Sequence, residues 1–373
     1  MKKIVLFAAM MLIGAIQSMN AQNEAGYSLE SIGKTLSRLN ITSLGDFHEG
    51  LAWVRVGSGE DERYGFVDTK GNLISPRYAR VKDFSDGFAC VGDGNWKFGF
   101  IDKQGNTVIP FSYGEYTGSF SDGLALINFH GNSKSYAYIN KNGEIVIPQF
   151  DAYQAKSFNG GIAPIEETKR NTHFIDKKGN IVIQSQPYRC YGFKDGFYMM
   201  DNFVIDTIGN VVVPAKYNNI SALSEGLCGV EISKENRTSG YSVSFLWGFY
   251  DINKKCESIQ PKYDAVSPFS EGFAAVQIGK KWGYINKQGE TVIACSFKHA
   301  YDFHEGFAFV NTDESYAIID KQGNIVTHLP NYDYFRGDFS EGLAVINQNG
   351  KWGYVDIHGN STFNPKANTK NNE

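Results

Sequence analysis

The feature that most constrains this chain is a four-residue pattern that returns nine times: an aromatic residue, two further residues and a glycine, with leucine replacing the aromatic once. It occurs as "FHEG", "FSDG" or "FSEG", among other variants. The intervals between successive copies run from 30 to 46 residues, and most lie near 36. The nine glycines are Gly50, Gly87, Gly123, Gly161, Gly196, Gly226, Gly272, Gly306 and Gly342. A chain with this periodicity must be built from similar units that pack on their neighbours.

A second, longer pattern follows most copies of the first, as in "FGFIDKQGNTVIPFSY" from Phe98 and "WGYINKQGETVIACSF" from Trp282. Alternating apolar residues after the first pattern, as in "LAVIN" from Leu343, predict a strand with one buried face. "WGYIN" predicts a second strand, whose glycine leaves room for a neighbouring backbone. "DKQGN" predicts a tight hairpin turn, in which Asp or Asn caps the turn and glycine adopts a positive φ. "TVIP" predicts a third strand that ends at proline.

Two structural questions stay open at this point. The stretch "YDAVSPF" from Tyr263 fits either a fourth short strand or a single helical turn. The alternation along the strands fits an open stack and a closed one equally. Because about 36 residues is short for a four-stranded propeller blade and nine blades would be unusual, we expect an all-β, open solenoid-like or superhelical stack of nine antiparallel units, with β-propeller-like closure as the alternative.

The two ends of the chain differ from the repeats. Residues 1–21, with two lysines followed by an apolar run from Ile4 to Ile16, are typical of a signal peptide and too short to span a bilayer comfortably. Residues 22–45 form an N-terminal cap segment, in which "SLESIGKTLSRL" from Ser28 predicts a helix over the edge of the first repeat. Residues 46–363 hold the nine repeats. Residues 364–373 predict a disordered tail.

The nine units resemble the WG-repeat family, also called KWG repeats, which is named for a Trp-Gly pair. That pair is present at Trp247-Gly248, Trp282-Gly283 and Trp352-Gly353, and Tyr-Gly, Phe-Gly or an alanine holds the place in other copies. The resemblance implies a repetitive bacterial scaffold, often exported, with no shared catalytic residues. We therefore expect a periplasmic, outer-surface or secreted protein.

Acidic residues precede eight of the nine motif glycines: Glu49, Asp86, Asp122, Asp195, Glu225, Glu271, Glu305 and Glu341. Stacked repeats would align them into a carboxylate ladder able to bind cations. The simpler interpretation, which we prefer, is that each accepts turn amide hydrogens in its own unit. Calcium at the "DKxGN" turns is disfavoured because one acid per turn supplies too few ligands.

Sequence motifs for catalysis and cofactor binding are absent. The seven histidines form no HExxH and no zinc spacing with cysteine, and there is no GxSxG, P-loop or dinucleotide motif. The five cysteines (Cys90, Cys190, Cys228, Cys256 and Cys295) are interpreted as small apolar fillers, with at most one or two disulfides among them. A net charge of −4 without a basic block gives no support to a nucleic-acid partner. We predict no enzyme activity, no catalytic, cofactor or metal residues, and no membrane span after signal cleavage.

Departures from the repeat are the candidate binding residues. The longest interval contains a polar insertion, Ser233 to Phe245, which predicts a surface loop. Trp53, Trp96, Tyr191 and Tyr198 lie outside the Trp-Gly position and are candidates for stacking on a sugar or a peptide, although most such rings pack between repeats. The sequence thus predicts an exported, non-enzymatic scaffold for protein or cell-envelope interactions, with a carbohydrate-binding module as the alternative.

Overall fold

The structure of the chain is a computed structural model that describes residues 26–129, 131, 134–236, 242–330 and 332–363. The expected signal peptide (residues 1–21), the expected tail (364–373) and the centre of the insertion (237–241) lie outside these residues. The chain divides into two compact units, Met1–Tyr78 with Tyr332–Glu373 (unit 1) and Ala79–Asn331 (unit 2).

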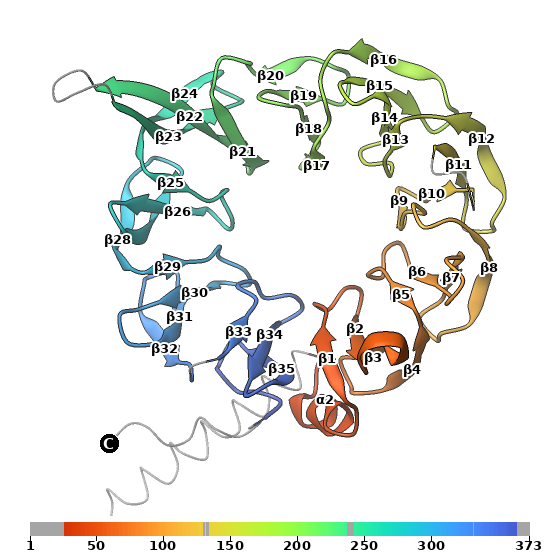
Figure 1. Cartoon of the computed structure of the whole chain (residues 1–373). Coiled ribbons are helices and arrows are strands. Elements are labelled where there is room, and N and C mark those ends of the chain that lie inside the picture. Colours follow the sequence, from red (N-terminus) through yellow and green to blue (C-terminus); the bar gives the residue numbers. More distant parts are fainter. Residues whose placement is uncertain (1–25, 130, 132–133, 237–241, 331, 364–373) are drawn as a thin grey trace, which may run out of the picture. The chain divides into compact units, whose positions relative to one another are not determined.

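The described residues form nine antiparallel sheets, eight with four strands and one with three, and each sheet uses consecutive strands of the chain (Figure 1). We call the sheets blades 1 to 9 in chain order. Blades 1 and 9 belong to unit 1, and blades 2 to 8 belong to unit 2. The fold is all-β and of the nine-bladed β-propeller type.

Unit 1 contains one helix and seven strands among its described residues. These are α2 (Leu29–Leu36), β1 (Ile41–Leu44), β2 (Leu51–Val56), β3 (Arg63–Asp68), β4 (Leu73–Tyr78), β33 (Tyr334–Phe335), β34 (Leu343–Gln348) and β35 (Lys351–Asp356), with a short 3-10 helix η1 (Gly59–Asp61) between β2 and β3.

Unit 2 contains the strands of seven blades. They are β5 (Arg80–Val81), β6 (Ala89–Gly92), β7 (Phe98–Ile101), β8 (Thr107–Tyr113); β9 (Phe120–Ser121), β10 (Leu124–Asn128), β11 (Ser135–Ile139), β12 (Ile145–Asp151); β13 (Gln154–Ala155), β14 (Ile162–Thr168), β15 (Asn171–Asp176), β16 (Ile181–Gln186); β17 (Gly192–Lys194), β18 (Phe197–Met199), β19 (Val204–Asp206), β20 (Val211–Val213); β21 (Asn219–Ser224), β22 (Leu227–Asn236), β23 (Ser242–Asp251), β24 (Cys256–Tyr263); β25 (Ala265–Val266), β26 (Phe273–Ile278), β27 (Lys281–Asn286), β28 (Thr291–Phe297); β29 (His299–Ala300), β30 (Phe307–Asn311), β31 (Tyr316–Asp320) and β32 (Ile325–His328).

The "FxEG" motif is a two-residue hairpin turn between the first and second strands of a blade. In blade 7, Glu271 has φ 52° and Gly272 has φ 90°. Ser270 and Phe273 exchange both backbone hydrogen bonds, at 2.8 and 3.1 Å. Positive φ at both central residues defines a type I′ turn, whose twist matches that of the flanking strands. The motif therefore fixes the position of the first strand in each blade.

The stretch "YDAVSPF" contains a fourth short strand and not a helical turn, because its centre is strand β25, which pairs with β26. This first strand is only two residues long in blade 7, and also in blades 2, 3, 4, 8 and 9. A four-stranded blade therefore fits into about 36 residues. The repeat length, which favoured an open stack in the sequence analysis, is thus compatible with a propeller.

The predicted turn and the predicted role of the Trp-Gly glycine are both confirmed. Gly289 of the blade 7 "NKQG" turn has φ 79° and donates a hydrogen bond to the Asn286 carbonyl at 2.9 Å. A Cβ atom on Gly283 would lie 2.5 Å from the Ile293 carbonyl oxygen, and one on Gly99 would lie 2.6 Å from that of Ile109. Strands three and four thus approach closely at a site that only glycine leaves free of strain.

Blades 1 and 9 lie side by side within unit 1, so the preferred open stack was wrong and the propeller-type alternative is confirmed. The rings of Phe47 in blade 1 and Tyr354 in blade 9 are 5.0 Å apart. The Tyr354 hydroxyl donates to the Gly45 carbonyl at 2.8 Å. Because the face that the last repeat offers to a following repeat is covered by the first repeat, neither is left exposed as the end of an open stack.

Helix α2 begins as predicted, with the Ser28 hydroxyl accepting a hydrogen bond from the Ser31 amide. Leu29, Ile32 and Leu36 are buried on one face. An open stack predicted that this helix would cover blade 1 alone, and this expectation was wrong. The helix contacts both blades of unit 1: Thr35 donates to the Gly71 carbonyl at 2.6 Å, and a Cβ on Gly33 would touch the Thr362 backbone.

The close approach at the Trp-Gly position predicts that Gly283→Ala destabilises the protein. The added methyl group must displace strand β28, which costs about 1–3 kcal/mol for an overpacked site. The measurement is the midpoint of urea denaturation. Ala317→Gly is the matched control, because blade 8 already accepts alanine at this position, and it should change stability by less than about 1 kcal/mol. Equal midpoints for Gly283→Ala and the wild type would contradict the steric role.

Candidate functional site

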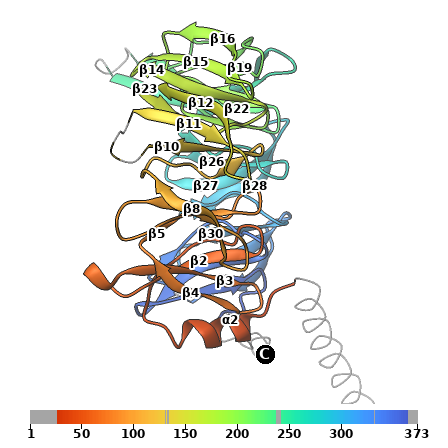
Figure 2. The same ribbon diagram turned by 90° about the vertical axis from the view of Figure 1, so that its right-hand side faces the viewer.

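Each blade presents two ends. The motif end carries the "FxEG" turns and the "DKxGN" turns. The variable end carries the hairpin between strands two and three and the link to the next blade, because antiparallel strands bring alternate connections to the same side. In Figure 2 the long β22–β23 hairpin projects at the variable end of unit 2.

The acid of the "FxEG" turn acts between blades rather than within its own unit, so the preferred interpretation of these residues was wrong. The Gly306 amide of blade 8 donates to the Glu271 carboxylate of blade 7 at 2.8 Å. The same contact joins Asp86 to Gly123 at 2.7 Å, and Asp122 to Gly161 at 2.8 Å. In unit 1 the Gly50 amide of blade 1 lies 3.0 Å from both Glu341 oxygens of blade 9.

A lysine of the neighbouring blade adds to this contact. Lys321 of blade 8 lies 3.1 Å from Glu271, and Lys287 of blade 7 lies 3.0 Å from Glu225. Burial works to raise the pKa of Glu271, but hydrogen bonding from the Gly306 amide and the charge of Lys321 outweigh it, so the pKa lies below its usual value. These carboxylates accept hydrogen bonds from backbone amides, and two of them also pair with a lysine ammonium group. Their contacts are therefore those of a structural link between blades. Among the described residues, no group of three or more His, Cys, Asp or Glu side chains is arranged to hold one.

Aromatic rings make a second contact between neighbouring blades. The first residue of the "FxEG" motif packs on the ring in strand three of the preceding blade, with centroids 4.8 Å apart for Tyr284 and Phe303 and also for Tyr138 and Phe158. The Tyr284 hydroxyl donates to the Tyr301 carbonyl at 2.7 Å. Burial raises the pKa of Tyr284, so it stays a neutral hydrogen-bond donor.

The "DKxGN" carboxylates cap their own turns, as predicted for this motif. Asp320 accepts the amides of Gln322 and Asn324 at 2.9 and 2.8 Å, and its other oxygen accepts from the Asn324 side chain. Blades 3 and 7 reverse the pair: Asn286 donates to Glu290 at 2.8 Å. The hydrogen bond is thus preserved while donor and acceptor exchange places.

Exposed aromatic residues of unit 2 gather at the variable end. Among its described residues, the exposed aromatics lie in the hairpins between strands two and three or in the links between blades: Trp96, Tyr116, Tyr153, Tyr191 and Phe245. Exposed aliphatic residues, with Ile278 as the exception, lie at or beside the start of the fourth strands, which is the motif end: Val108, Ile145, Val146, Ile181, Val182, Ile208, Val211, Val292, Ile325 and Val326. The two ends of the blades therefore differ in chemistry.

Neighbouring charges hold two of these aromatic side chains in place. The Arg80 guanidinium lies 4.5 Å from the centre of the Trp96 ring, and Trp96 is 52% exposed. The link that carries Tyr191, which is 61% exposed, is fixed through its neighbour Arg189. Arg189 lies 3.7 Å from the fully buried carboxylate of Glu166. Cation–π contacts and ion pairs of this kind reduce the entropy that an aromatic side chain loses on binding.

The other two predicted aromatic candidates are poor binding residues. Tyr198 is 1% exposed and its hydroxyl donates to the Ile162 carbonyl at 2.7 Å. Trp53 is half-buried, and its ring lies 5.9 Å from that of Tyr64. Sequence reasoning missed Tyr116 and Tyr153, which follow the fourth strands of blades 2 and 3. The sequence signal that could have identified them is their place in the links between blades, after the end of a fourth strand.

The described residues of the insertion, 233–236 and 242–245, are paired strands rather than a loop. Ser233 pairs with Phe245 and Asn236 pairs with Ser242, in register with the rest of β22 and β23. Phe245 is exposed on this extension. Continuous pairing gives the extension a defined direction, whereas a loop of that length would sample many.

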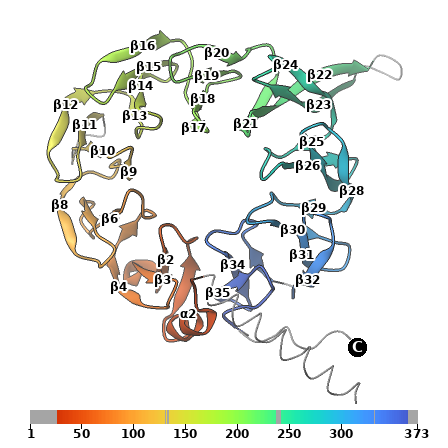
Figure 3. The same ribbon diagram turned by 180° about the vertical axis from the view of Figure 1, so that it is seen from behind.

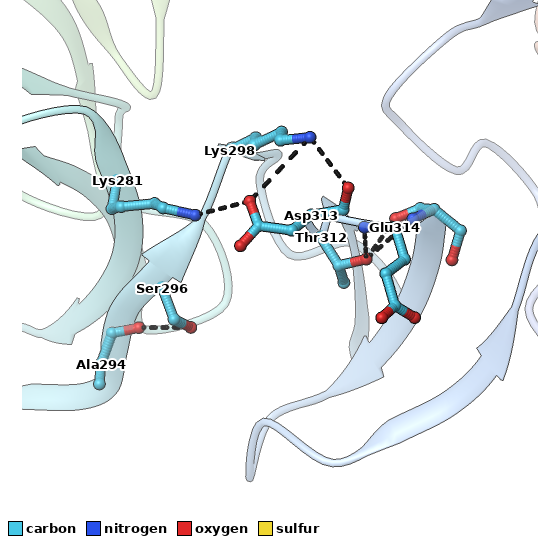
Figure 4. Close-up of polar contacts among 8 residues, drawn as sticks. Lys281, Ala294, Ser296, Lys298, Thr312, Asp313 and Glu314 are labelled. Atoms are coloured by element: carbon cyan, nitrogen blue, oxygen red, sulfur yellow. Dashed lines mark hydrogen bonds and ion pairs between the residues drawn. The ribbon is translucent and has the colours of Figure 1, made fainter.

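Blades 7 and 8 carry a charged cluster at the variable end instead of aromatic residues (Figure 4). Lys281 lies 2.8 Å from the Asp313 carboxylate, and Lys298 donates to the Asp313 carbonyl at 3.0 Å. The hydrogen bond and charge of Lys281 lower the pKa of Asp313. Because Asp313 is exposed, the cluster contributes little to stability.

The five cysteines are free. Burial raises the pKa of Cys90 to about 12 and that of Cys190 to about 11. Thiols with such pKa values remain protonated at neutral pH and are inert as nucleophiles. Among the described residues, no helix has the length and apolar character needed to cross a membrane.

The chain belongs to the WG-repeat family. The family model, described as a WG containing repeat, matches residues 64–95, 98–132, 136–169, 174–200, 203–234, 247–282, 282–316 and 316–352. Those eight matches cover most of the nine units counted from the sequence. A comparison with curated proteins finds no match.

Several solved structures are similar over much of their length. BamB from Moraxella catarrhalis is 9% identical with a TM-score of 0.42, over 84% of this chain and 95% of that chain. Hsv2 from Kluyveromyces lactis is 10% identical with a TM-score of 0.36, over 57% and 87%. The WD40 β-propeller domain of Doa1 is 10% identical with a TM-score of 0.31, over 75% and 92%. With identities and TM-scores this low, the family match alone identifies the chain.

The contact between blades predicts a pH-dependent loss of stability in Glu271→Gly. Removing the carboxylate loses a hydrogen bond to a charged group, worth about 1.5–3 kcal/mol, while glycine relieves a left-handed backbone strain of about 1 kcal/mol. We therefore expect a net loss of about 1 kcal/mol at pH 7. Because the pKa of Glu271 is lowered on folding, its contribution exists above the unfolded pKa of about 4.3 and is lost as the pH falls through the folded pKa.

Urea denaturation at pH 7 and at pH 3 tests this expectation. The deficit of Glu271→Gly should shrink or vanish at the lower pH. The control is the reverse change in blade 4, Gly160→Asp, where a Cβ would meet the Phe193 ring at 2.8 Å and which should destabilise at both pH values. A deficit in Glu271→Gly that is equal at both pH values would contradict a role for the ionised carboxylate.

Proposed function

We propose that this protein is an exported, non-catalytic scaffold that binds a partner protein or cell-envelope component through the variable end of its blades. The observation that carries the proposal is the separation of exposed side chains in unit 2, with aromatic residues at the variable end and aliphatic ones at the motif end. Aromatic side chains bury large areas for a small entropy cost, and they dominate the energetics of protein interfaces.

The repeat itself supports a scaffold. The residues that recur in each unit are occupied by contacts between blades: the acid with the next glycine amide, the ring with the next ring, and the turn glycine beside the preceding blade. Gly323 of blade 8, for example, lies against Ile293 of blade 7. Residues with structural roles of this kind are not available for catalysis, while the hairpins and links are free to vary.

Export is proposed from the first 21 residues, whose apolar run follows two lysines. A scaffold outside the cytoplasm would meet envelope proteins and glycans. Carbohydrate binding is the second candidate function, favoured by Trp96 and Tyr191. Each has an arginine beside its ring, at 4.5 and 5.8 Å. A flat exposed ring with a neighbouring cation can stack on a sugar and hydrogen-bond its hydroxyl groups.

The test is affinity capture after mild cross-linking in the native host, comparing wild type with a Trp96→Ala/Tyr191→Ala variant. We expect a defined protein partner whose recovery falls at least about tenfold, because rings of this kind are typical binding hot spots. The matched control is Ile181→Ala/Val292→Ala, which removes exposed side chains from the motif end and should leave recovery unchanged.

Other outcomes contradict parts of the proposal. Equal recovery of the partner protein with both variants would show that Trp96 and Tyr191 are not part of the binding site. Failure to recover any protein, together with binding to a glycan array that depends on Trp96, would replace the scaffold by the carbohydrate-binding alternative.

A further inference from the structure

The link between blades 4 and 5 covers a charged side chain that has no contact with solvent. The link, residues 187–191, runs from β16, the last strand of blade 4, to β17, the first strand of blade 5 (Figures 1 and 3). Glu166 of β14 is 0% exposed, and neither of its carboxylate oxygens accepts a hydrogen bond from a described residue. A buried carboxylate is costly unless cations compensate it, so the structure must keep cations beside it.

Two cations lie beside this carboxylate. Lys156 Nζ lies 3.6 Å from one Glu166 oxygen and also donates a hydrogen bond to the Cys190 carbonyl of the link. Arg189 belongs to the link itself, and its Nε lies 3.7 Å from the other Glu166 oxygen. Two positive charges against one negative charge leave the cluster with an excess of one positive charge.

Arg189 presents the end of its guanidinium group to solvent. Its side chain is 44% exposed, and no described residue accepts a hydrogen bond from it. Because Nε faces Glu166, the two terminal Nη groups remain for a ligand. The Asp201 carboxylate lies near the main chain instead, 3.5 Å from the Arg189 amide nitrogen. A planar guanidinium with two such N–H groups is suited to bind a carboxylate in a bidentate manner.

The exposed ring of Tyr191 lies beside this guanidinium group. Its centre is 5.8 Å from Arg189 Cζ, and the side chain is 61% exposed. Tyrosine and arginine are among the residues enriched in binding hot spots. The other described arginines of unit 2, Arg80 and Arg170, also lie at the variable end. Of the three, only Arg189 forms an ion pair with a described residue, so its side chain is the best positioned for recognition.

We propose that Arg189 and Tyr191 receive a carboxylate of the partner protein, and that the buried Glu166 is a positioning residue that holds the guanidinium group in place. The inference rests on the proposed function and adds the chemistry of the partner, a segment with exposed Glu or Asp side chains. The exposed aromatic residues of unit 2 extend over the hairpins and links of several blades, a surface that suits a protein better than a short glycan. The excess positive charge attracts the carboxylate, and the Nη groups bind it.

The experiment measures the binding of a fluorescein-labelled, C-terminally amidated oligoglutamate to the full chain by fluorescence anisotropy. We expect saturable binding of this peptide and no binding of the matching oligoglutamine. Arg189→Lys should weaken the oligoglutamate at least about threefold, because lysine keeps the charge but loses the bidentate geometry.

The matched control is Arg170→Lys, which changes an exposed arginine in the β14–β15 hairpin of blade 4. It keeps the net charge as Arg189→Lys does, and it should bind the oligoglutamate as wild type does. Absence of saturable binding, or equal affinities of the two variants, would overturn the proposal.

Glu166→Gln separates positioning from charge. The change adds one positive charge to the cluster, so a role in electrostatics alone would tighten oligoglutamate binding. Positioning predicts weaker binding, because the guanidinium group loses the carboxylate that orients it. Urea denaturation checks that each variant is folded, and Arg189→Lys, a change at an exposed side chain, tests the site even if Glu166→Gln does not fold. Tighter binding by a folded Glu166→Gln variant would overturn the role of Glu166.

An oligogalacturonate, which carries its carboxylates on a glycan, is the competing ligand. Displacement of the labelled peptide at lower concentrations of unlabelled oligoglutamate than of oligogalacturonate supports a protein source of the carboxylate. Tighter binding of the oligogalacturonate, lost in Arg189→Lys, would overturn that source and assign the site to an acidic glycan.

Failure of this inference is distinguishable from failure of the proposed function. A captured partner protein that depends on Trp96 and Tyr191, but is recovered equally with Arg189→Lys, would leave the scaffold standing and overturn this inference. Oligoglutamate binding that depends on Arg189, without any captured protein, would support the carboxylate site and contradict the scaffold.

Discussion

The hydrogen bond from a motif glycine amide to the carboxylate of the preceding blade is the contact on which this architecture depends. It places a charged acceptor at a residue whose φ is near 52°, a region that costs a non-glycine residue about 1 kcal/mol. Glycine would fit the turn without strain, and blade 4 uses it at Gly160. Elsewhere an acid occupies the strained position, and its side chain can reach the next blade, as Glu271 does at the Gly306 amide. Glu225 and Glu271 also meet a lysine of the next blade. The turn therefore connects two strands of its own blade and also binds the following blade.

Other consensus residues also join each blade to the next one. Rings in strand three pack on the first ring of the next motif at about the same centroid distance in blades 3 and 7, as for Tyr138 with Phe158 and Tyr284 with Phe303. Ser270 donates to the Phe303 carbonyl at 2.6 Å, and Ser85 donates to that of Phe120 at 2.7 Å. In unit 1 this set of contacts joins blade 9 to blade 1. A repeat whose invariant positions all face its neighbour leaves its hairpins and links free for recognition, which is where the exposed aromatic residues of unit 2 lie.

The sequence predicted the units well and their association poorly, for a physical reason. Turn chemistry and strand alternation are local, so the "DKQGN" turn, the glycine at Gly283 and helix α2 could all be predicted. The partner of Glu271 is 35 residues away, and every motif offers the same glycine amide, so its own turn and the next one fit the pattern equally. Closure was missed because strand one is too short to show periodicity. For the binding residues, burial separated Tyr191 from Tyr198: one lies in a link and the other in strand β18, a distinction that composition does not carry.

The central claim, that the motif acid acts on the following blade, is tested most directly by amide hydrogen exchange in wild type and Glu271→Gly. The readout compares the turn that contains Gly306 with the turn that contains Gly272, resolved as separate peptides by mass spectrometry. The claim predicts faster exchange at the Gly306 turn, where the amide loses its acceptor, with little change at the Gly272 turn, whose backbone pairing does not involve the carboxylate. Faster exchange confined to the Gly272 turn would contradict it and would return the acid to its own repeat.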